Sequence, residues 1–297
     1  MAASLYPERL ETVIALFEMV AGIGMMIGPV IAGLLYDYVG FRWIFYGMGI
    51  IFLCILPGVF TIAEPERFDM EQEIEVSVFT MCTYKEVLLD AGAVAYVIMC
   101  LGVMETYVST HLLALGLSIE EVGLAFATDP AVYTVCCFMY GKVLRTMNLR
   151  RVIQAGLLLG VLSSLLMGPP YPLPASGISV VLGMTVMGAA IASTYVPALP
   201  HMIAAAESLG FFVDDRLNDA LSSVASGSFS LGEMLGPILG GVALHYMDFR
   251  NLVTIMAGVG LVFFLFHFLL YRRDVRFAME MRHSLTFYKH IHSSLFI

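Results

Sequence analysis

The chain has 297 residues, of which 59% are hydrophobic and only 13% are charged, and its mean hydropathy is +0.86. Soluble globular proteins have about 45–50% apolar and about 25% charged residues. So little charge cannot keep several long apolar stretches in water, which excludes a soluble enzyme and a disordered protein. The net charge of −9 leaves no basic face for nucleic acid. We therefore expect an integral, multi-pass membrane protein.

Eight apolar stretches are long enough to cross a hydrocarbon core of about 30 Å, which needs roughly 20 residues of helix. They are continuous apolar runs without the two-residue alternation of a membrane barrel, so the pattern predicts helices. They cover 12–36, 43–63, 91–115, 122–144, 152–170, 177–205, 218–246 and 251–271. The expected fold class is all-α, a polytopic bundle of eight transmembrane helices.

The lysines and arginines predict how these helices are oriented. If the N-terminus and every second loop share one side, that side carries thirteen of the 15 basic residues, and the other carries only Arg42 and Arg250. Because basic residues accumulate on the cytoplasmic side, we expect both termini to be cytoplasmic. The membrane is left open between a vesicular or other internal membrane and the plasma membrane.

The cysteines give no sign of a metal site or a disulfide framework. Four of the five lie within apolar runs, their spacing matches no framework, and the sequence contains no Cys/His cluster. We expect no metal, no cofactor and no enzyme activity.

One sequence segment occurs twice, at an offset of 208 residues. GMMIGPVIAGLLYDYVGFR at 24–42 and GEMLGPILGGVALHYMDFR at 232–250 share eight of nineteen residues, chiefly glycine, proline and the final Phe-Arg. Repeats related by an axis along the membrane normal are typical of transporters. If one repeat is six helices, the chain corresponds to the last eight of twelve.

This interpretation divides the chain into four segments. Residues 1–63 would hold the last two helices of an N-terminal six-helix bundle, and 64–90, with the stretch EPERFDMEQEIE, an acidic cytoplasmic linker. Residues 91–271 would form the complete C-terminal six-helix bundle, and 272–297 a basic cytoplasmic tail.

Three segments carry recognisable motifs. LFEMVAGIGMMIGPVIAGLLYDYVGF at 16–41 joins a glutamate to a glycine-rich helix, VMETYVSTHL at 103–112 contains a mid-span acid, and EVGLAFATDPAVYTVCCFMYG at 121–141 contains a proline and a tyrosine. Together they resemble the fifth, seventh and eighth helices of the vesicular amine and polyamine transporter family (solute carrier family 18) of the major facilitator superfamily. The resemblance implies an antiporter with a small organic cation, protons and the lipid bilayer as partners.

Three positions depart from that family. Thr106 stands where the family has a proline, and Ala192 where monoamine carriers have an aspartate, which puts a monoamine substrate in doubt. Arg145 replaces the aspartate of the superfamily's cytoplasmic loop motif and weakens a gating salt bridge there.

Acidic residues inside spans are the main candidates for chemistry, because such residues are costly and usually face the bundle interior or a water-filled path. Glu105 lies mid-span at the family's acidic position and is the first candidate for substrate and proton binding. The alternative is a neutral glutamate hydrogen-bonded to a neighbouring helix. Glu18 also matches the family, with proton transfer and a structural hydrogen bond both open.

Asp129 and Tyr133 complete the candidate substrate and proton site. Pro130 leaves the carbonyl of Phe126 without its helical donor, so Asp129 either functions in the site or belongs to a local kink. Tyr133 matches the family and could stack on a cation, with packing as the alternative.

Three other titratable residues are weaker candidates. Glu233 lies near a helix end, where a lumen-facing role is one interpretation. His111 and His201 could relay protons or could simply be packed.

The glycines and prolines of the repeat form a candidate structural antiporter motif. Small residues let helices approach closely, and the resemblance implies a helix that limits leakage; tight packing alone is the alternative. The motif comprises Gly24, Gly28, Pro29 and Gly33 in the first copy and Gly236, Pro237 and Gly241 in the second.

The leading hypothesis is a carrier that exchanges protons for organic cations, of amine or polyamine type, by alternating access. Two alternatives remain: a multidrug efflux carrier of the same superfamily, and a truncated paralogue that binds or scaffolds without transporting.

The basic-residue distribution makes a testable prediction about topology. A peptide tag at the C-terminus and another within 64–90 should both be accessible from the cytosol in cells whose plasma membrane alone is permeabilised. Tags that become accessible on opposite sides of the membrane would contradict the eight-span arrangement.

Overall fold

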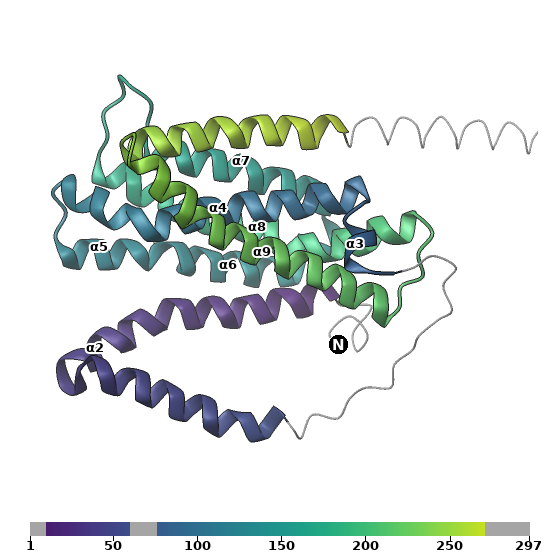
Figure 1. Cartoon of the computed structure of the whole chain (residues 1–297), viewed down its shortest axis with the longest axis horizontal. Helices are drawn as coiled ribbons and strands as arrows, with labels where there is room; N and C mark the ends of the chain where they lie inside the picture. The colour runs from purple at the N-terminus through teal and green to yellow at the C-terminus, as the bar shows by residue number, and fades with distance from the viewer. Residues whose placement is uncertain (1–9, 60–75, 271–297) are drawn as a thin grey trace, which may run out of the picture.

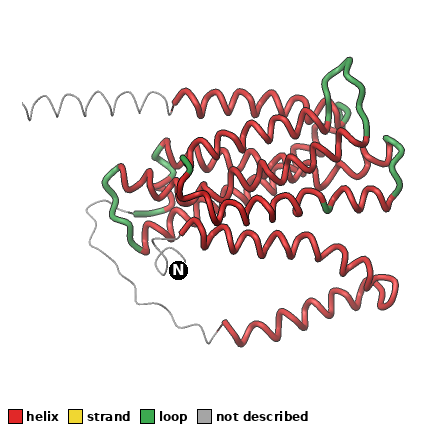
Figure 2. The backbone as a smooth tube through the Cα atoms, turned by 180° about the vertical axis from the view of Figure 1, so that it is seen from behind, coloured by secondary structure: helices red, strands yellow, loops and turns green. Residues whose placement is uncertain are grey.

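A computed structural model describes residues 10–59 and 76–270 (Figure 1). These ranges consist of helices joined by loops, without a strand, as Figure 2 shows. The predicted all-α class is confirmed. The helices are α2 (Leu10–Val59), α3 (Val78–Met81), α4 (Lys85–Ala114), α5 (Ile119–Phe126), α6 (Thr128–Val143), the 3-10 turn η2 (Leu144–Thr146), α7 (Leu149–Met167), α8 (Gly177–Ser208), α9 (Asp215–Leu244) and a last helix, Phe249–Leu270.

Six apolar helical segments in the described ranges are long enough to cross a membrane: Lys85–Ala114, Glu121–Thr146, Leu149–Met167, Gly177–Ser208, Asp215–Leu244 and Phe249–Leu270. Two shorter apolar segments, Thr12–Gly28 and Arg42–Gly58, coincide with the first two predicted spans. The first of these six segments, α4, begins at Lys85, six residues before the predicted start at 91. The end of the expected linker is therefore helical. The rest of that linker to residue 75 and the tail at 272–297 lie outside the described residues.

Polar side chains mark where the helices begin. The side-chain oxygens of Asn148, Ser176 and Asp214 each accept a hydrogen bond from the backbone N–H three residues on, at the starts of α7, α8 and α9. At α5, Ser118 and Glu121 form a reciprocal capping box. Because these backbone N–H groups have no partner within the helix, each cap ends a loop at a defined residue between two apolar runs.

Helix α2 consists of two arms joined at a single glycine. Gly40 has φ 75° and ψ 167°, a conformation that residues with a Cβ rarely adopt. The first arm lies along the bundle, against α6 and α8, whereas the second turns back and lies apart from it (Figures 1 and 2). Trp43 and Phe52 on the second arm are 67% and 70% exposed. The kink agrees with the break that the sequence predicts between residues 36 and 43.

The remaining helices form one packed body. Helix α7 packs along α8, α4 packs along α9, and α8 also contacts α4 and α6, so α8 lies at the centre. Its glycines permit these contacts: a Cβ at Gly183 would lie 2.9 Å from the carbonyl oxygen of Ser163 on α7, and one at Gly188 would lie 3.0 Å from Oδ1 of Asp129 on α6. The core therefore depends on small residues at helix crossings.

The two copies of the repeat have different surroundings. A Cβ at Gly236 would lie 2.5 Å from the carbonyl oxygen of Met99 and 3.0 Å from Cα of Gly102, both on α4. Gly241 faces the hydroxyl of Tyr107, 2.7 Å from such a Cβ, and this hydroxyl donates a 2.7 Å hydrogen bond to the carbonyl of Pro237. The second copy is thus an interhelical contact.

The first copy faces open space in the described part of the chain. A Cβ at Gly24 or Gly28 would have no atom within 4 Å beyond the local helix backbone. Pro29 and Gly33 lie in α2, but their immediate surroundings are outside what the structure describes.

These glycines predict stability changes of opposite sign at equivalent repeat positions. Gly236→Ala should destabilise the purified chain in detergent by about 1–3 kcal/mol, because the added methyl group meets the backbone of α4. Gly28→Ala should be neutral or stabilising by about 0.5–1 kcal/mol, because alanine favours the helix and meets nothing. Thermal unfolding of the two variants and the parent measures both effects, and equal shifts would contradict the difference in packing.

Candidate functional site

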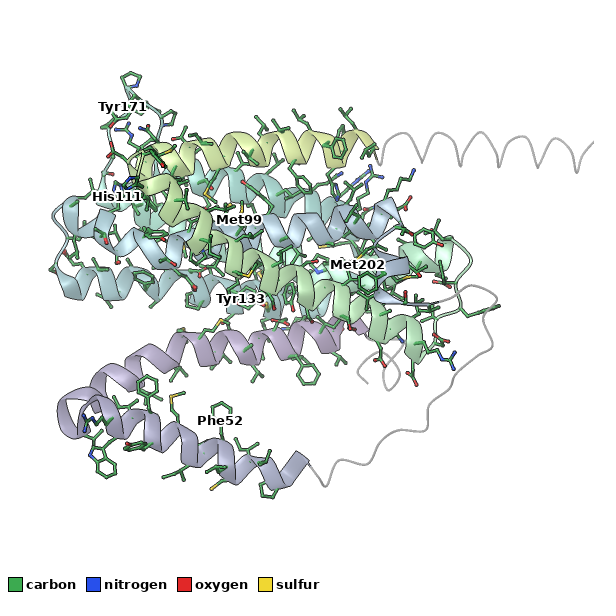
Figure 3. All side chains as sticks on the ribbon, in the orientation of Figure 1. Phe52, Met99, His111, Tyr133, Tyr171 and Met202 are labelled. Carbon is green, nitrogen blue, oxygen red and sulfur yellow. The ribbon has the colours of Figure 1, made fainter. Side chains whose placement is uncertain are left out.

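The candidate site is centred on α6, between the first arm of α2 and α8. Asp129 and Tyr133 are four residues apart on α6 and therefore lie on one face of the helix. The Tyr133 hydroxyl donates a 2.6 Å hydrogen bond to Oε2 of Glu18 on α2. Tyr133 itself is buried, with 7% of its surface exposed, and its label lies midway along the bundle in Figure 3. Two residues far apart in the sequence thus meet at mid-span.

Other contacts hold the first arm of α2 on α6. The Thr12 hydroxyl donates a 2.9 Å hydrogen bond to the carbonyl of Gly141. Gly22 faces Tyr133 and Thr134 so closely that a methyl group there would meet both side chains. A larger residue at Gly22 would push α2 away from α6. The Glu18–Tyr133 hydrogen bond therefore depends on the close approach of the two helices that Gly22 permits.

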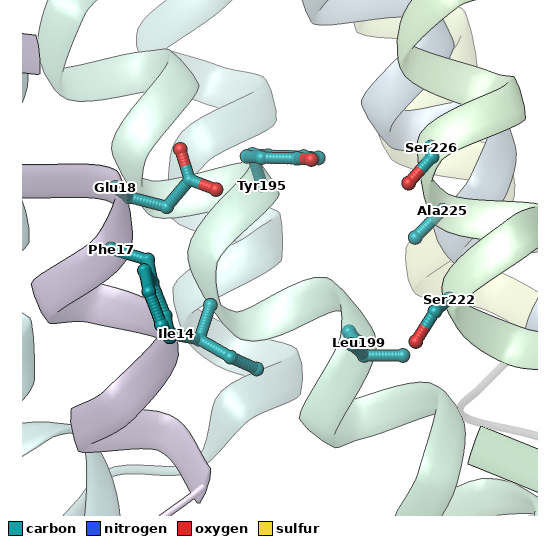
Figure 4. Close-up of a pocket in the computed structure, with 8 residues that line it drawn as sticks. All are labelled: Ile14, Phe17, Glu18, Tyr195, Leu199, Ser222, Ala225 and Ser226. Carbon is teal, nitrogen blue, oxygen red and sulfur yellow. The ribbon is translucent and has the colours of Figure 1, made fainter. Parts of the chain in front are cut away.

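Glu18 also lines a cavity of about 170 Å³ between α2, α8 and α9 (Figure 4). Its carboxylate lies beside the ring of Tyr195, and Ser222 and Ser226 line the opposite wall. The lining residues are Ile14, Phe17, Glu18, Tyr195, Leu199, Ser222, Ala225 and Ser226. The cavity therefore combines one carboxylate, two aromatic rings and two serine hydroxyl groups within an apolar wall.

The other predicted acids, Glu105 and Asp129, do not contact Glu18 through a hydrogen bond in the described chain. Glu105, on α4, is exposed, and its charge interacts with those of Glu233 on α9 and Asp129 on α6. Asp129 is 8% exposed, and its Oδ1 has no hydrogen-bond partner among the described residues. The helical run breaks at Ala127, between the end of α5 at Phe126 and the start of α6 at Thr128. This is the break that Pro130 predicts, because a proline cannot donate a hydrogen bond to the carbonyl of Phe126. Asp129 thus interacts with Glu105, whereas Tyr133, one turn further along α6, contacts Glu18.

Sequence reasoning missed Tyr195 and the two serines. Tyr195 follows Ser193 and Thr194, which makes three successive polar residues in a largely apolar span. Ser222 and Ser226 are four residues apart and so share one face of α9. Both patterns were available in the sequence, but only the packing of α2, α8 and α9 brings them to one cavity with Glu18.

The Glu18–Tyr133 hydrogen bond predicts a stability effect. Tyr133→Phe should destabilise the chain in detergent by about 1–3 kcal/mol, because it removes the donor to a half-buried carboxyl group. Tyr246→Phe is the matched control, since Tyr246 is 79% exposed, and it should leave the unfolding midpoint unchanged. In a double-mutant cycle with Glu18→Gln, strictly additive effects would show that the two side chains do not interact.

Comparison with known proteins agrees with this architecture. The family model of the Major Facilitator Superfamily matches residues 1–213. The MFS-type transporter SLC18B1 is 26% identical over 276 residues in Rattus norvegicus (88% of this chain, 59% of the relative) and 25% identical over 287 residues in Homo sapiens (92% and 61%). The chromaffin granule amine transporter of Rattus norvegicus is 23% identical over 276 residues (89% and 50%). The chain thus matches about half to three-fifths of the length of these relatives. With most of its length matched by the family model, the chain belongs to the Major Facilitator Superfamily and resembles the transporters of solute carrier family 18.

Proposed function

We propose that this chain is the larger part of a twelve-helix carrier that exchanges protons for small organic cations across a membrane by alternating access. The observation that carries the proposal is the cavity at Glu18. A carboxylate attracts an ammonium group, the rings of Phe17 and Tyr195 can lie against a cation, and the apolar wall accepts its hydrocarbon part. The amine transporter among the relatives supports the same class of substrate.

Binding at Glu18 would affect the contact between the two halves of the carrier. The first arm of α2 belongs to the N-terminal half, whereas α6 and α8 belong to the C-terminal half. The Tyr133–Glu18 hydrogen bond joins these halves at 2.6 Å. A cation at Glu18 competes with Tyr133 for the carboxylate. The bound substrate and the Tyr133–Glu18 hydrogen bond would therefore stabilise different conformational states of the carrier.

Glu105 is the proposed proton-binding residue, with Asp129 beside it. An ionised acid at the centre of a bilayer costs at least about 2.5–3.5 kcal/mol on insertion scales. Glu105 is exposed on α4, so in a complete carrier we place it in the central cavity, closed by the other helices of the N-terminal half. There it would bind a proton in one state and release it in the other. Both termini would be cytoplasmic.

Uptake measurements test the proposal. In a chain completed to twelve helices with those of a family member, Glu105→Gln should abolish uptake of an organic amine driven by a proton gradient, because glutamine cannot bind and release a proton. Glu18→Gln should raise the substrate concentration needed for half-maximal uptake, because it removes the charge at the cavity.

Two controls accompany these variants. Glu207→Gln changes an exposed acid near the end of α8 and should transport at the parent's rate. The chain by itself, in liposomes with an acidic interior, should show no saturable uptake, because alternating access needs two complete bundles. Full uptake by Glu105→Gln would remove this residue from the mechanism, and saturable, gradient-driven uptake by the chain alone would overturn the requirement for further helices.

A further inference from the structure

A second polar cluster lies inside the bundle, away from the candidate site. It joins four helices: Asp90 comes from α4, Gln154 from α7, His201 from α8 and His267 from the helix Phe249–Leu270. Asp90 precedes Glu105 by fifteen residues, about 22 Å along α4. In Figure 3, Met202, the neighbour of His201, lies toward the opposite end of the bundle from His111.

Asp90 is the centre of this cluster. Its Oδ2 lies 2.6 Å from Nδ1 of His201, and its Oδ1 lies 3.5 Å from Nε2 of His267. Nδ1 of His267 in turn lies 3.4 Å from Nε2 of Gln154. Asp90 and His267 are completely buried, Gln154 is 8% exposed, and the His201 side chain is 16% exposed. His201 is therefore the member closest to the surroundings.

A buried carboxylate needs a positive partner within the protein, because removing a charge from water is costly unless it is paired. The hydrogen bonds of Asp90 in the described chain go to the two imidazoles. The other charged residues of α4, α7, α8 and α9 at this end of the bundle are Lys85 and Glu86 on α4, Arg150 and Arg151 on α7, Glu207 on α8, and Asp215, Arg216 and Asp219 on α9, and each lies nearer its helix end than the cluster does. The histidines are thus placed to supply the compensating charge.

Gln154 allows His267 to be satisfied in two protonation states. With Nδ1 unprotonated, the Gln154 NH₂ group donates to it, as the present geometry has it, and Nε2–H points to Asp90. If Nδ1 gains a proton, a half-turn of the amide presents the Gln154 oxygen as an acceptor. A proton can therefore enter this site without leaving a buried donor unpaired, which would otherwise be costly.

We propose that Asp90, Gln154, His201 and His267 form a proton-binding site, in which His267 takes up one proton at Nδ1 and lies as an imidazolium between the Asp90 carboxylate and the Gln154 oxygen. Uptake turns the contact with Asp90 into an ion pair and makes the contact with Gln154 charge-assisted, and such hydrogen bonds are shorter and stronger than neutral ones. His201, the most exposed member of the cluster, connects Asp90 to the surroundings. This site is separate from Glu18 and Glu105, and the proposal holds whether or not the protein transports.

The test follows the ring nitrogens of histidine in the full chain, labelled with nitrogen-15 at histidine and held in lipid nanodiscs. The His267 signals are assigned by their loss in His267→Gln. As the pH falls, the parent should show His267 with both nitrogens protonated. In Asp90→Asn the ratio of the doubly protonated to the neutral form should fall by about tenfold or more at the same pH, because the carboxylate charge is lost.

Variants at Gln154 provide a second measurement with less risk to folding. Gln154→Leu should lower that ratio, since Nδ1–H then has no acceptor, whereas Gln154→Glu should raise it. His245→Gln, at the exposed end of α9, is the control and should leave the His267 signals unchanged. The proposal is overturned if His267 remains a single neutral tautomer at every pH where the chain is folded, or if its protonation is the same in the parent and all three Asp90 and Gln154 variants.

Discussion

A polar side chain in hydrocarbon has no water to bond to, so its partners must come from the protein. In this chain the partners come from other helices. Tyr133 donates to Glu18 across 115 positions of sequence, and His267 faces Asp90 across 177. Lipid is as apolar as the helix surfaces, so apolar contact alone does not decide which helices become neighbours. The few polar contacts do so here, because an alternative packing would leave a carboxylate or an imidazole unpaired.

Close approach of helices is the other condition for these contacts. A 2.6 Å hydrogen bond between α2 and α6 requires that Gly22 leave room for Tyr133 and Thr134. Gly188 has the same function where α8 crosses α6 at Asp129. Small residues and polar pairs therefore operate together: the first bring the backbones close, and the second select one arrangement among several that small residues would allow.

The cavity at Glu18 shows how such packing produces a site. Its walls come from α2, α8 and α9, and they meet where the first arm of α2 packs along the bundle. The charge and one aromatic ring come from α2, the second ring comes from α8, and the serine hydroxyl groups come from α9. Combined, they provide the properties that an organic cation requires, whereas none of the three helices provides them alone.

The sequence by itself determined the helices and the family, because long apolar runs, capping residues and glycine motifs are local patterns. It also made Glu18, Tyr133, Asp129 and Glu105 candidates, since a polar residue in an apolar run is visible without a structure. Only the tertiary structure decided which of them meet: Glu18 contacts Tyr133, whereas Glu105 lies near Asp129 and Glu233. It also separated the two repeat copies, since Gly236 packs on α4 while Gly28 faces open space. The physical reason is that a residue's environment depends on the helices packed against it, and equal local sequences can have different neighbours.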